Sequence, residues 1–281
     1  MRYSVSHVGN RLGNDIQQFA NSILLAKYHG ATVEQRLDHP VVDKFLISFG
    51  KDGDLVSGKF YAWEPLAHAE LGFAGGNELG ISRDYVYANM REVCRDHLYP
   101  HLKVEHKEPL DDDTLVIHIR GGDVFDHVYE VPFNYVQNPW VYYERLLDEF
   151  PKIIVVAEPE FSSNTTTINQ SPILEKLSTI DRIKIQSSSL AEDYATLLSA
   201  KNLATSGVGT FAISAALCSR NIKNLFVTNL CLTEHLNYNM MINTDVIVNE
   251  MELSDYIPVY PCSWRNDETQ RKFIMEYKLP E

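Results

Sequence analysis

The stretch TLVIHIRGGD, residues 114–123, is the clearest indication of the fold. Residues 114–119 are mostly branched apolar side chains interrupted by one histidine, a pattern typical of a strand buried in a parallel sheet. Alternate side chains of a strand point to opposite faces, so His118 and Arg120 should share one face. The strand runs directly into two glycines and an aspartate, and α/β folds place ligand sites at this end of their strands.

Strand and helix patterns alternate on the carboxyl side of this stretch. Short apolar runs predict further strands, and apolar residues at intervals of three or four predict the helices between them. In chain order the segments are a helix at 141–150, a strand at 152–157, a helix at 173–177, a strand at 183–185, a helix at 190–201, a strand at 203–206, a helix at 211–220 and a strand at 225–228. This alternation predicts a doubly wound α/β domain.

A second α/β unit is predicted at the amino terminus. Residues 4–8 suit a short strand, a turn with two glycines follows, and residues 16–27 carry the apolar spacing of an amphipathic helix. Gly30 should end that helix, and residues 31–34 suit the next strand. Strand, helix and strand in this order form a βαβ unit, which favours a parallel sheet.

A charged stretch at 104–114, with one proline and three aspartates, separates the two units. We therefore expect an amino-terminal α/β domain at 1–108 and a larger α/β domain at 109–265. A further helix is predicted at 83–97. Residues 266–281 also contain a helical pattern, and we expect that helix to cross back to the first domain.

The composition excludes several classes of protein. The chain has 281 residues, of which 44% are hydrophobic and 22% charged, which are ordinary values for a globular protein. Its 25 basic and 38 acidic residues give a net charge of −13, which disfavours nucleic acid as a partner. The four cysteines have no zinc-ligand spacing, so no metal is expected. The chain carries no signal peptide and no apolar run long enough for a membrane span, so we expect a cytoplasmic location, in a bacterial cell or a virus-infected host cell.

Arg120 is the first candidate binding residue. Burying a guanidinium is costly unless an anion pairs with it, and arginine binds phosphate through two parallel hydrogen bonds. Gly121 and Gly122 clear space beside it, so a diphosphate is a natural ligand. The alternative is an internal ion pair between Arg120 and Asp123.

A second candidate is the turn SGVGTF, residues 206–211, which joins a strand to a helix. Hydroxyls and backbone N–H groups at such a helix start can bind an anion. Phe211 could pack on a base or sugar, and Asp193, one βα unit earlier, could accept from a base or ribose. The alternative is structural, with Thr210 as helix cap, Phe211 in the core and Asp193 on a solvated face.

Two further elements have weaker signals. The turn RLGN, residues 11–14, again opens a helix, although a plain turn capped by Asn14 is the alternative. Asp111–Asp113 could suggest a metal-binding motif, but they precede their strand, and exposed acidic loops are common.

Taken in order, RLGN, HIRGGD and SGVGTF resemble the motifs of the fucosyltransferase superfamily. This group includes α-1,2- and α-1,6-fucosyltransferases and protein O-fucosyltransferases, with an RLGNQ-like loop, an HxRxxD-like strand end and a later Ser/Thr-Phe turn. The resemblance implies a GT-B-like fold, in which two Rossmann-type domains face a cleft. It also implies metal-independent, inverting transfer of a sugar, fucose above all, from a nucleotide-sugar donor to an oligosaccharide acceptor, without a further cofactor.

The resemblance also implies a role for each matching residue. Arg120 would hold the donor diphosphate, His118 would lie near the nucleotide, and Asp193 would recognise the base. The second phosphate and nucleotide turn would consist of Ser206, Gly207, Thr210 and Phe211. The loop that lines the cleft from the amino-terminal domain would consist of Arg11, Gly13 and Asn14.

Two positions depart from the family pattern. Asp15 stands where the family usually has glutamine, and Gly121 stands where many α-1,2 enzymes have a second arginine. The missing arginine leaves the donor open between GDP-fucose and a UDP-sugar such as UDP-xylose. Asp123 is the first candidate for the base that deprotonates the acceptor hydroxyl and Asp15 the second, while some relatives manage without an obvious base.

Two other functions stay open from the sequence. One is a metal-dependent transferase of the GT-A type that uses Asp111–Asp113. The other is a non-catalytic module that binds a nucleotide or a glycan.

Overall fold

The computed structural model describes residues 1–6, 8–9, 11–51, 53–58, 60, 81–125, 135–158, 171–231, 235–253, 255–256 and 267–280. These residues form a mixed α/β fold with two sheets of mainly parallel strands. The smaller sheet comes from the amino-terminal part of the chain, and the larger one from residue 114 onward. The α/β class predicted from the alternating pattern is therefore confirmed.

The smaller sheet has the strand order β3-β2-β1-β4. Its strands are β1 (Arg2–Val5), β2 (Thr32–Gln35), β3 (Phe45–Ser48) and β4 (Leu55–Gly58). β1 pairs in parallel with β2 and β4, and β3 adds an antiparallel edge. The strand predicted at 4–8 begins earlier, at Arg2, and ends at Val5.

Helix α1 (Leu12–His29) connects β1 to β2 and ends where the sequence predicts. Gly30 follows it with a φ of 58°, in the left-handed region, and its N–H donates to the last turn. This is the usual glycine stop of a helix. The βαβ unit predicted at the amino terminus is thus present.

The larger sheet has the order β10-β9-β8-β5-β6-β7, with every recorded pair parallel. Its strands are β5 (Thr114–Ile119), β6 (Lys152–Ala157), β7 (Ile183–Gln186), β8 (Asn202–Ala204), β9 (Asn224–Thr228) and β10 (Ile247–Met251). β5, the strand with which the sequence argument began, lies inside the sheet and is buried along its whole length.

Helices cover both faces of the larger sheet, as a doubly wound fold requires. α3 (Trp140–Glu149) and α4 (Pro172–Ser178) lie over the face that buries Leu115 and Ile117. α5 (Leu190–Ser199) and α6 (Phe211–Cys218) lie over the opposite face, which buries Val116. Alternation along β5 therefore supplies both cores.

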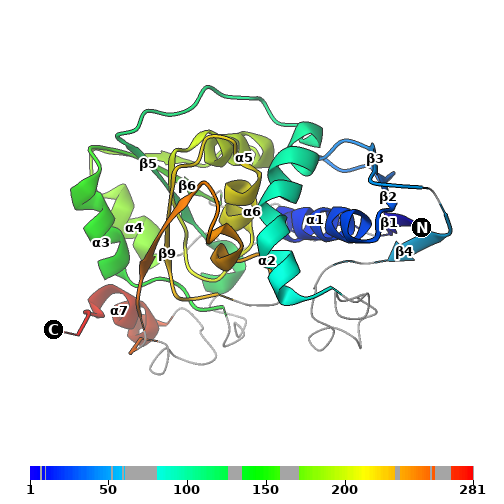
Figure 1. Ribbon diagram of the computed structural model, residues 1–281. Coiled ribbons are helices and arrows are strands. Elements are labelled where there is room, and N and C mark those ends of the chain that lie inside the picture. The colour runs from blue at the N-terminus through cyan, green and yellow to red at the C-terminus, as the bar shows by residue number, and fades with distance from the viewer. Residues whose placement is uncertain are drawn as a thin grey trace.

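The carboxyl-terminal helix α7 (Glu268–Glu276) packs against α3 and α4. Ile274 is fully buried in the core that it shares with Tyr142. The prediction that this helix crosses back to the amino-terminal part is therefore wrong. Figure 1 shows α7 beside the larger sheet, at the end of the molecule away from the amino terminus.

One hydrophobic core joins the two sheets. It contains Phe19 and Ile23 of α1, together with Leu197 of α5 and Leu217 of α6. Figure 1 shows α1 running from the smaller sheet to α6. The sheets lie on either side of the expected boundary at 104–114, but the packing between them is continuous.

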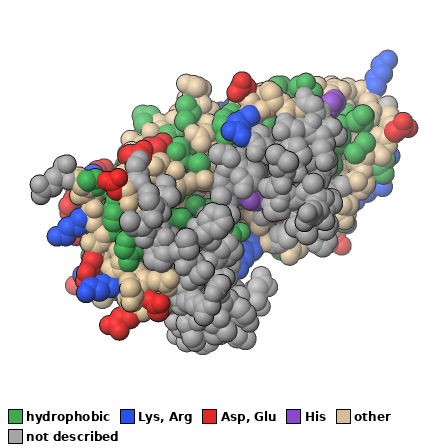
Figure 2. Space-filling view, turned by 90° about the horizontal axis from the view of Figure 1, so that it is seen from below, with side chains coloured by type: hydrophobic (Ala, Val, Ile, Leu, Met, Phe, Trp, Pro, Cys, Tyr) green, Lys and Arg blue, Asp and Glu red, His purple; other side chains and the backbone are tan. Residues whose placement is uncertain are grey.

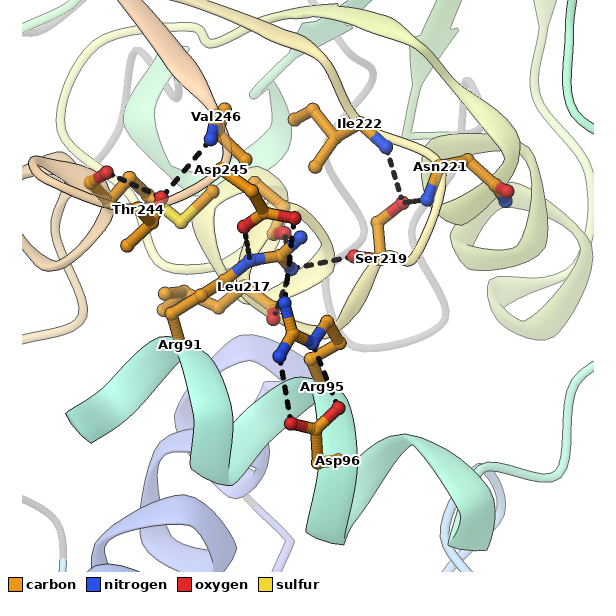
Figure 3. Close-up of polar contacts among 12 residues, drawn as sticks. Arg91, Arg95, Asp96, Leu217, Ser219, Asn221, Ile222, Thr244, Asp245 and Val246 are labelled. Atoms are coloured by element: carbon orange, nitrogen blue, oxygen red, sulfur yellow. Dashed lines mark hydrogen bonds and ion pairs between the residues drawn. The ribbon is translucent and has the colours of Figure 1, made fainter.

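Arg91 ties helix α2 (Arg83–Glu92) to the carboxyl end of α6. Its Nη1 donates to three carbonyl oxygens, those of Ala216, Leu217 and Ser219, at 2.9, 2.7 and 2.6 Å (Figure 3). Asp245 lies 3.5 Å from Nε of the same buried guanidinium. A cation here satisfies the last carbonyls of the helix and complements its dipole.

Helix α2 continues into the π-helical turn Val93–Leu98 and the 3₁₀ turn Tyr99–His101. The helix predicted at 83–97 therefore corresponds to α2 and most of the turn that follows it. None of the helices in the described part of the chain is both long and apolar enough to span a bilayer. Figure 2 shows one face of the molecule, where basic and acidic side chains lie interspersed at the left end.

Candidate functional site

A cavity of about 530 Å³ lies at the carboxyl ends of the strands of the larger sheet. Five neighbouring strands each contribute a residue that follows them: Leu230 after β9, Thr205 after β8, Arg120 after β5, Glu158 after β6 and Ser188 after β7. Residues 11–14, at the start of α1, line the cavity from the smaller sheet. The cavity thus occupies the sheet edge at which α/β folds hold their ligands.

Most of the residues predicted for the site line this cavity. They are Arg11, Gly13, Asn14, His118, Arg120, Asp193, Gly207, Thr210 and Phe211. Ser206 lies behind the wall, with its hydroxyl 3.3 Å from His118 Nδ1. Gly121 is not among the lining residues, and Asp123 lies in the turn Gly122–Phe125 with its side chain outside the described part. The alternative of an internal Arg120–Asp123 ion pair is therefore untested, and the role of Asp123 as first candidate base stays a prediction.

Arg120 follows β5 and lies on the cavity wall. Its guanidinium carbon is 4.6 Å from the centre of the Tyr135 ring, and Nη1 donates to the Val208 carbonyl at 3.2 Å. An aromatic face and a carbonyl oxygen thus orient the guanidinium at the cavity wall. The arginine side chain is therefore placed where it can meet a ligand in the cavity.

His118 is a buried residue of this wall, between Ser206 and Phe211. Its ring centre lies 5.1 Å from that of Phe211. Burial, and to a lesser extent the nearby Arg120 cation, lowers the pKa of His118 from 6.5 to about 3. The imidazole is therefore neutral at physiological pH, and the positive charge here belongs to Arg120.

The amino-terminal ends of α1 and α6 meet at the cavity. Thr210 Oγ1 donates to Asn14 Oδ1 at 2.9 Å, and a Cβ added to Gly13 would lie 2.5 Å from the Thr210 hydroxyl. Gly13 is therefore required for this approach. The first N–H groups and the dipole of each helix favour an anion at this point.

The structure shows how the side chains of these two turns are used. The residue before α1 is Arg11, so Asn14 lies inside the helix and does not cap it. Thr210 occupies the capping position of α6, but its side chain makes no capping hydrogen bond, because the hydroxyl is used on Asn14. Thr210 and Asn14 therefore bond to each other and do not cap their helices, while Phe211 packs against the core, as the structural alternative expected.

Asp193 lies on α5 and is buried at the cavity wall, not on a solvated helix face. Its Oδ1 accepts from Gln186 Nε2 at 2.8 Å, and the Ser188 N–H lies 3.2 Å from both oxygens. Burial raises the pKa of Asp193, and these hydrogen bonds partly oppose the rise. The carboxyl group is therefore held in a fixed orientation.

Asp15 does not line the cavity, although it was the second candidate for the base. It is buried, and its Oδ2 lies 3.3 Å from His39 Nε2 and 3.4 Å from the Gly9 N–H. His39 Nδ1 accepts from the N–H groups of Val41 and Val42, so its Nε2 carries the proton. Asp15 thus fixes the loop before α1 and is not placed to reach a substrate.

Asp111–Asp113 lie at the amino end of β5, the opposite edge of the sheet. Asp111 and Asp113 pair with Lys152 at 2.9 and 3.2 Å, and Asp112 pairs with Lys223 at 2.9 Å and Lys201 at 3.2 Å. Lysine partners therefore already balance these carboxylates. Within the described residues, no group of three or more His, Cys, Asp or Glu side chains is arranged to hold a metal.

Several residues that line the cavity were not predicted from the sequence. Glu158 and Ser188 follow strands β6 and β7, so the strand-end rule applied to every predicted strand would have found them. His235 and Tyr238 come from the segment between β9 and β10, where no motif marks them. Only the folded chain brings this segment to the cavity.

The arrangement suits an elongated ligand with an anionic centre. Arg120 and two helix ends lie near the middle of the strand order, Asp193 lies towards β7, and His235 lies against Gln17 of α1. The lining contains two arginines, Arg11 and Arg120, and two carboxylates, Glu158 and Asp193, in a chain that as a whole is acidic. Comparison with protein-family models, curated proteins and solved structures finds no match for this chain.

Proposed function

We propose that the chain is a glycosyltransferase that moves a sugar from a nucleoside-diphosphate sugar to a glycan hydroxyl, with inversion and without a metal. Fucose is the sugar that the motif resemblance favours. In this proposal the two sheets belong to the facing halves of a GT-B arrangement, with the cavity between them. The observation that carries the proposal is the meeting of Arg120 with the amino-terminal ends of α1 and α6 at the cavity.

The chemistry of the leaving group explains why Arg120 and the two helix ends should lie together. A nucleoside diphosphate gains negative charge as its bond to the sugar breaks, so groups of fixed positive charge lower the barrier. Arg120 would hold the diphosphate through paired hydrogen bonds, and the N–H groups at Phe211 would support it. These groups are in place before the ligand arrives, so little reorganisation is needed.

The side of the cavity near β7 suits the nucleoside. Asp193 offers a fixed carboxylate acceptor for a base N–H or a ribose hydroxyl, and Phe211 offers an aromatic surface. Both GDP-fucose and a UDP-sugar present such donors. The donor nucleotide is therefore what the first experiment should determine.

The first experiment is a thermal-shift and calorimetric screen against GDP, UDP and their sugars. We expect one nucleoside diphosphate to raise the melting temperature, and Arg120→Ala to weaken its binding by about 100-fold, since a charge-assisted contact of about 3 kcal/mol is lost. Arg220→Ala is the matched control, because Arg220 also lies over a tyrosine ring, Tyr99 at 4.7 Å, but outside the cavity.

Unchanged binding by Arg120→Ala would show the diphosphate assignment to be wrong. Transfer of sugar to a glycan in the presence of EDTA would exclude the metal-dependent alternative. Tight nucleotide binding without release of sugar from any donor would instead support a non-catalytic binding module.

A further inference from the structure

The cavity is also lined by a histidine that the proposed nucleotide site does not use, His235, from the segment that follows β9. His235 is buried, with 8% of its surface exposed, and it lines the cavity together with Cys231 and Tyr238. Its Nδ1 lies 3.3 Å from Oε1 of Gln17, a buried residue of α1. Helix α1 therefore holds a titratable ring at the cavity.

The hydrogen bonds around Gln17 define the tautomer of this ring. The Leu236 N–H, which can only donate, reaches Gln17 Oε1 at 3.1 Å, so this atom is the carboxamide oxygen. A carboxamide oxygen only accepts, and His235 Nδ1 must therefore carry a proton in its contact with it. In the neutral ring, Nε2 then holds the lone pair.

The contacts of His235 show which part of a ligand it would meet. Asp193 lies near β7, and Arg120 follows the more central β5. His235 lies against α1, where its ring contacts Gln17, about one helical turn beyond Gly13, and Gly13 approaches Thr210 at the start of α6. A ligand with its nucleoside near Asp193 and its diphosphate at Arg120 and the start of α6 would extend its sugar towards α1 and His235.

Other titratable groups in the cavity suit the role of base less well. Glu158 follows β6, between Arg120 and Asp193 in the strand order, and thus lies on the nucleoside side. Tyr238 has a pKa raised by burial, so its hydroxyl stays protonated at neutral pH. Cys231, on the same segment, accepts a hydrogen bond from Asn239 Nδ2 at 3.7 Å.

We infer that His235 is the general base for the acceptor hydroxyl, an assignment that rests on the proposed transferase function. Its Nε2 takes the hydroxyl proton as the acceptor oxygen forms a bond to the anomeric carbon. The bond from that carbon to the diphosphate oxygen breaks, and its electron pair leaves with the nucleoside diphosphate. The imidazolium later returns its proton to solvent. Gln17 is the positioning residue, because it fixes both the tautomer and the orientation of the ring.

The test compares His235→Gln with the wild-type protein. Glutamine can still form hydrogen bonds but cannot take a proton, so we expect kcat for transfer to fall by about 100-fold or more. The Kd for the nucleoside diphosphate should change less than twofold. The loss of transfer at acid pH that we expect for wild type should be absent from the variant. His106→Gln is the matched control, since His106 is exposed and lies outside the cavity.

The outcomes separate this inference from the function on which it rests. A wild-type protein that binds no nucleoside diphosphate would overturn both. Wild-type transfer together with His235→Gln activity within threefold of it would overturn the base assignment alone.

Gln17→Glu provides a second test that does not depend on the stability of His235→Gln. The glutamate keeps an acceptor oxygen for His235 and the Leu236 N–H, and its negative charge favours the protonated ring. We expect the acid limb of the kcat profile to move to higher pH by about one unit. An acid limb that stays in place would mean that another group controls transfer.

Discussion

The backbone groups at the two ends of α6 have different surroundings. At the carboxyl end, the Arg91 guanidinium enters from α2 and occupies three carbonyl oxygens, so protein atoms complete the helix. At the amino end, the Thr210 hydroxyl is used on Asn14, and the first N–H groups of the helix lie beside a cavity. The carbonyl oxygens at the carboxyl end of α6 are thus satisfied by protein atoms, whereas its amino end borders the candidate ligand site.

The two ends of α6, a helix of eight residues, should therefore matter for different properties. The carboxyl end should matter for stability and the amino end for ligand binding. Where a buried side chain satisfies the backbone, a substitution should mainly change the free energy of unfolding. Where helix ends border a cavity, a substitution should also change the affinity for an anion. The following predictions test that separation, in order of decreasing effect.

The largest expected effect is at the carboxyl end of α6. Arg91→Met should lower the free energy of unfolding by about 3 kcal/mol or more, because it leaves buried carbonyl oxygens without their donor. Denaturant titration measures this change. Arg95→Met is the matched control: Arg95 lies one turn further on, pairs with Asp96 at 2.8 Å on the surface, and should cost less than about 1 kcal/mol. Equal losses for the two variants would contradict the role given to Arg91.

A smaller loss of stability is expected at the amino end. Gly13→Ala places a Cβ 2.5 Å from Thr210 Oγ1 and 2.7 Å from the Phe211 nitrogen, which forces α1 and α6 apart. Such overpacking costs about 1–3 kcal/mol, and the affinity for the nucleoside diphosphate should fall as well.

The control for this substitution is Gly209→Ala, assessed by thermal denaturation. Its new Cβ would meet Arg120 Nη1 at 3.5 Å, an ordinary contact, so its melting temperature should stay near that of wild type. A Gly13→Ala protein as stable as Gly209→Ala would mean that the two helix ends do not need their close approach.

The third prediction concerns the stability in acid of the region at the amino end of α6, where His118 packs against Phe211. His118 has a pKa of about 3 in the folded protein against 6.5 for the free side chain, so between these values the unfolded chain binds a proton that the folded protein does not. Stability is therefore lost as pH falls through this window, by up to about 1.4 kcal/mol per pH unit. His118→Asn should reduce that slope, as denaturant titrations at several pH values would show. An unchanged slope would contradict a neutral, buried His118.

The interior strands and the edge strand β7 were predictable from the sequence, whereas the edge strands β3, β4 and β10 were not. β5 and β6 are runs of branched apolar residues because both of their faces are buried. β10, with the sequence IVNEM, lies at an edge and is largely exposed, so no apolar run marks it. β3 is likewise an edge strand, and Leu46 within it is 68% exposed.

The parts of the site that are local in sequence were also predictable. Arg120 and the turn around Thr210 each join a strand to a helix, so their place at the sheet edge follows from the strand itself. His235 could not be predicted, because its contact with Gln17 joins residues more than two hundred positions apart. Asp15 was misjudged for a similar reason, since His39 and the fold of the smaller unit decide where its carboxylate points.

The core shared by the two sheets has a consequence for any attempt to divide the protein. A fragment ending at residue 108 would keep α1 but lose α6, against which α1 packs in the shared core. Neither half is then a self-sufficient module, and the intact chain should unfold in one cooperative transition. Chimaeras that exchange one half between related proteins would have to carry matching α1 and α6 surfaces together.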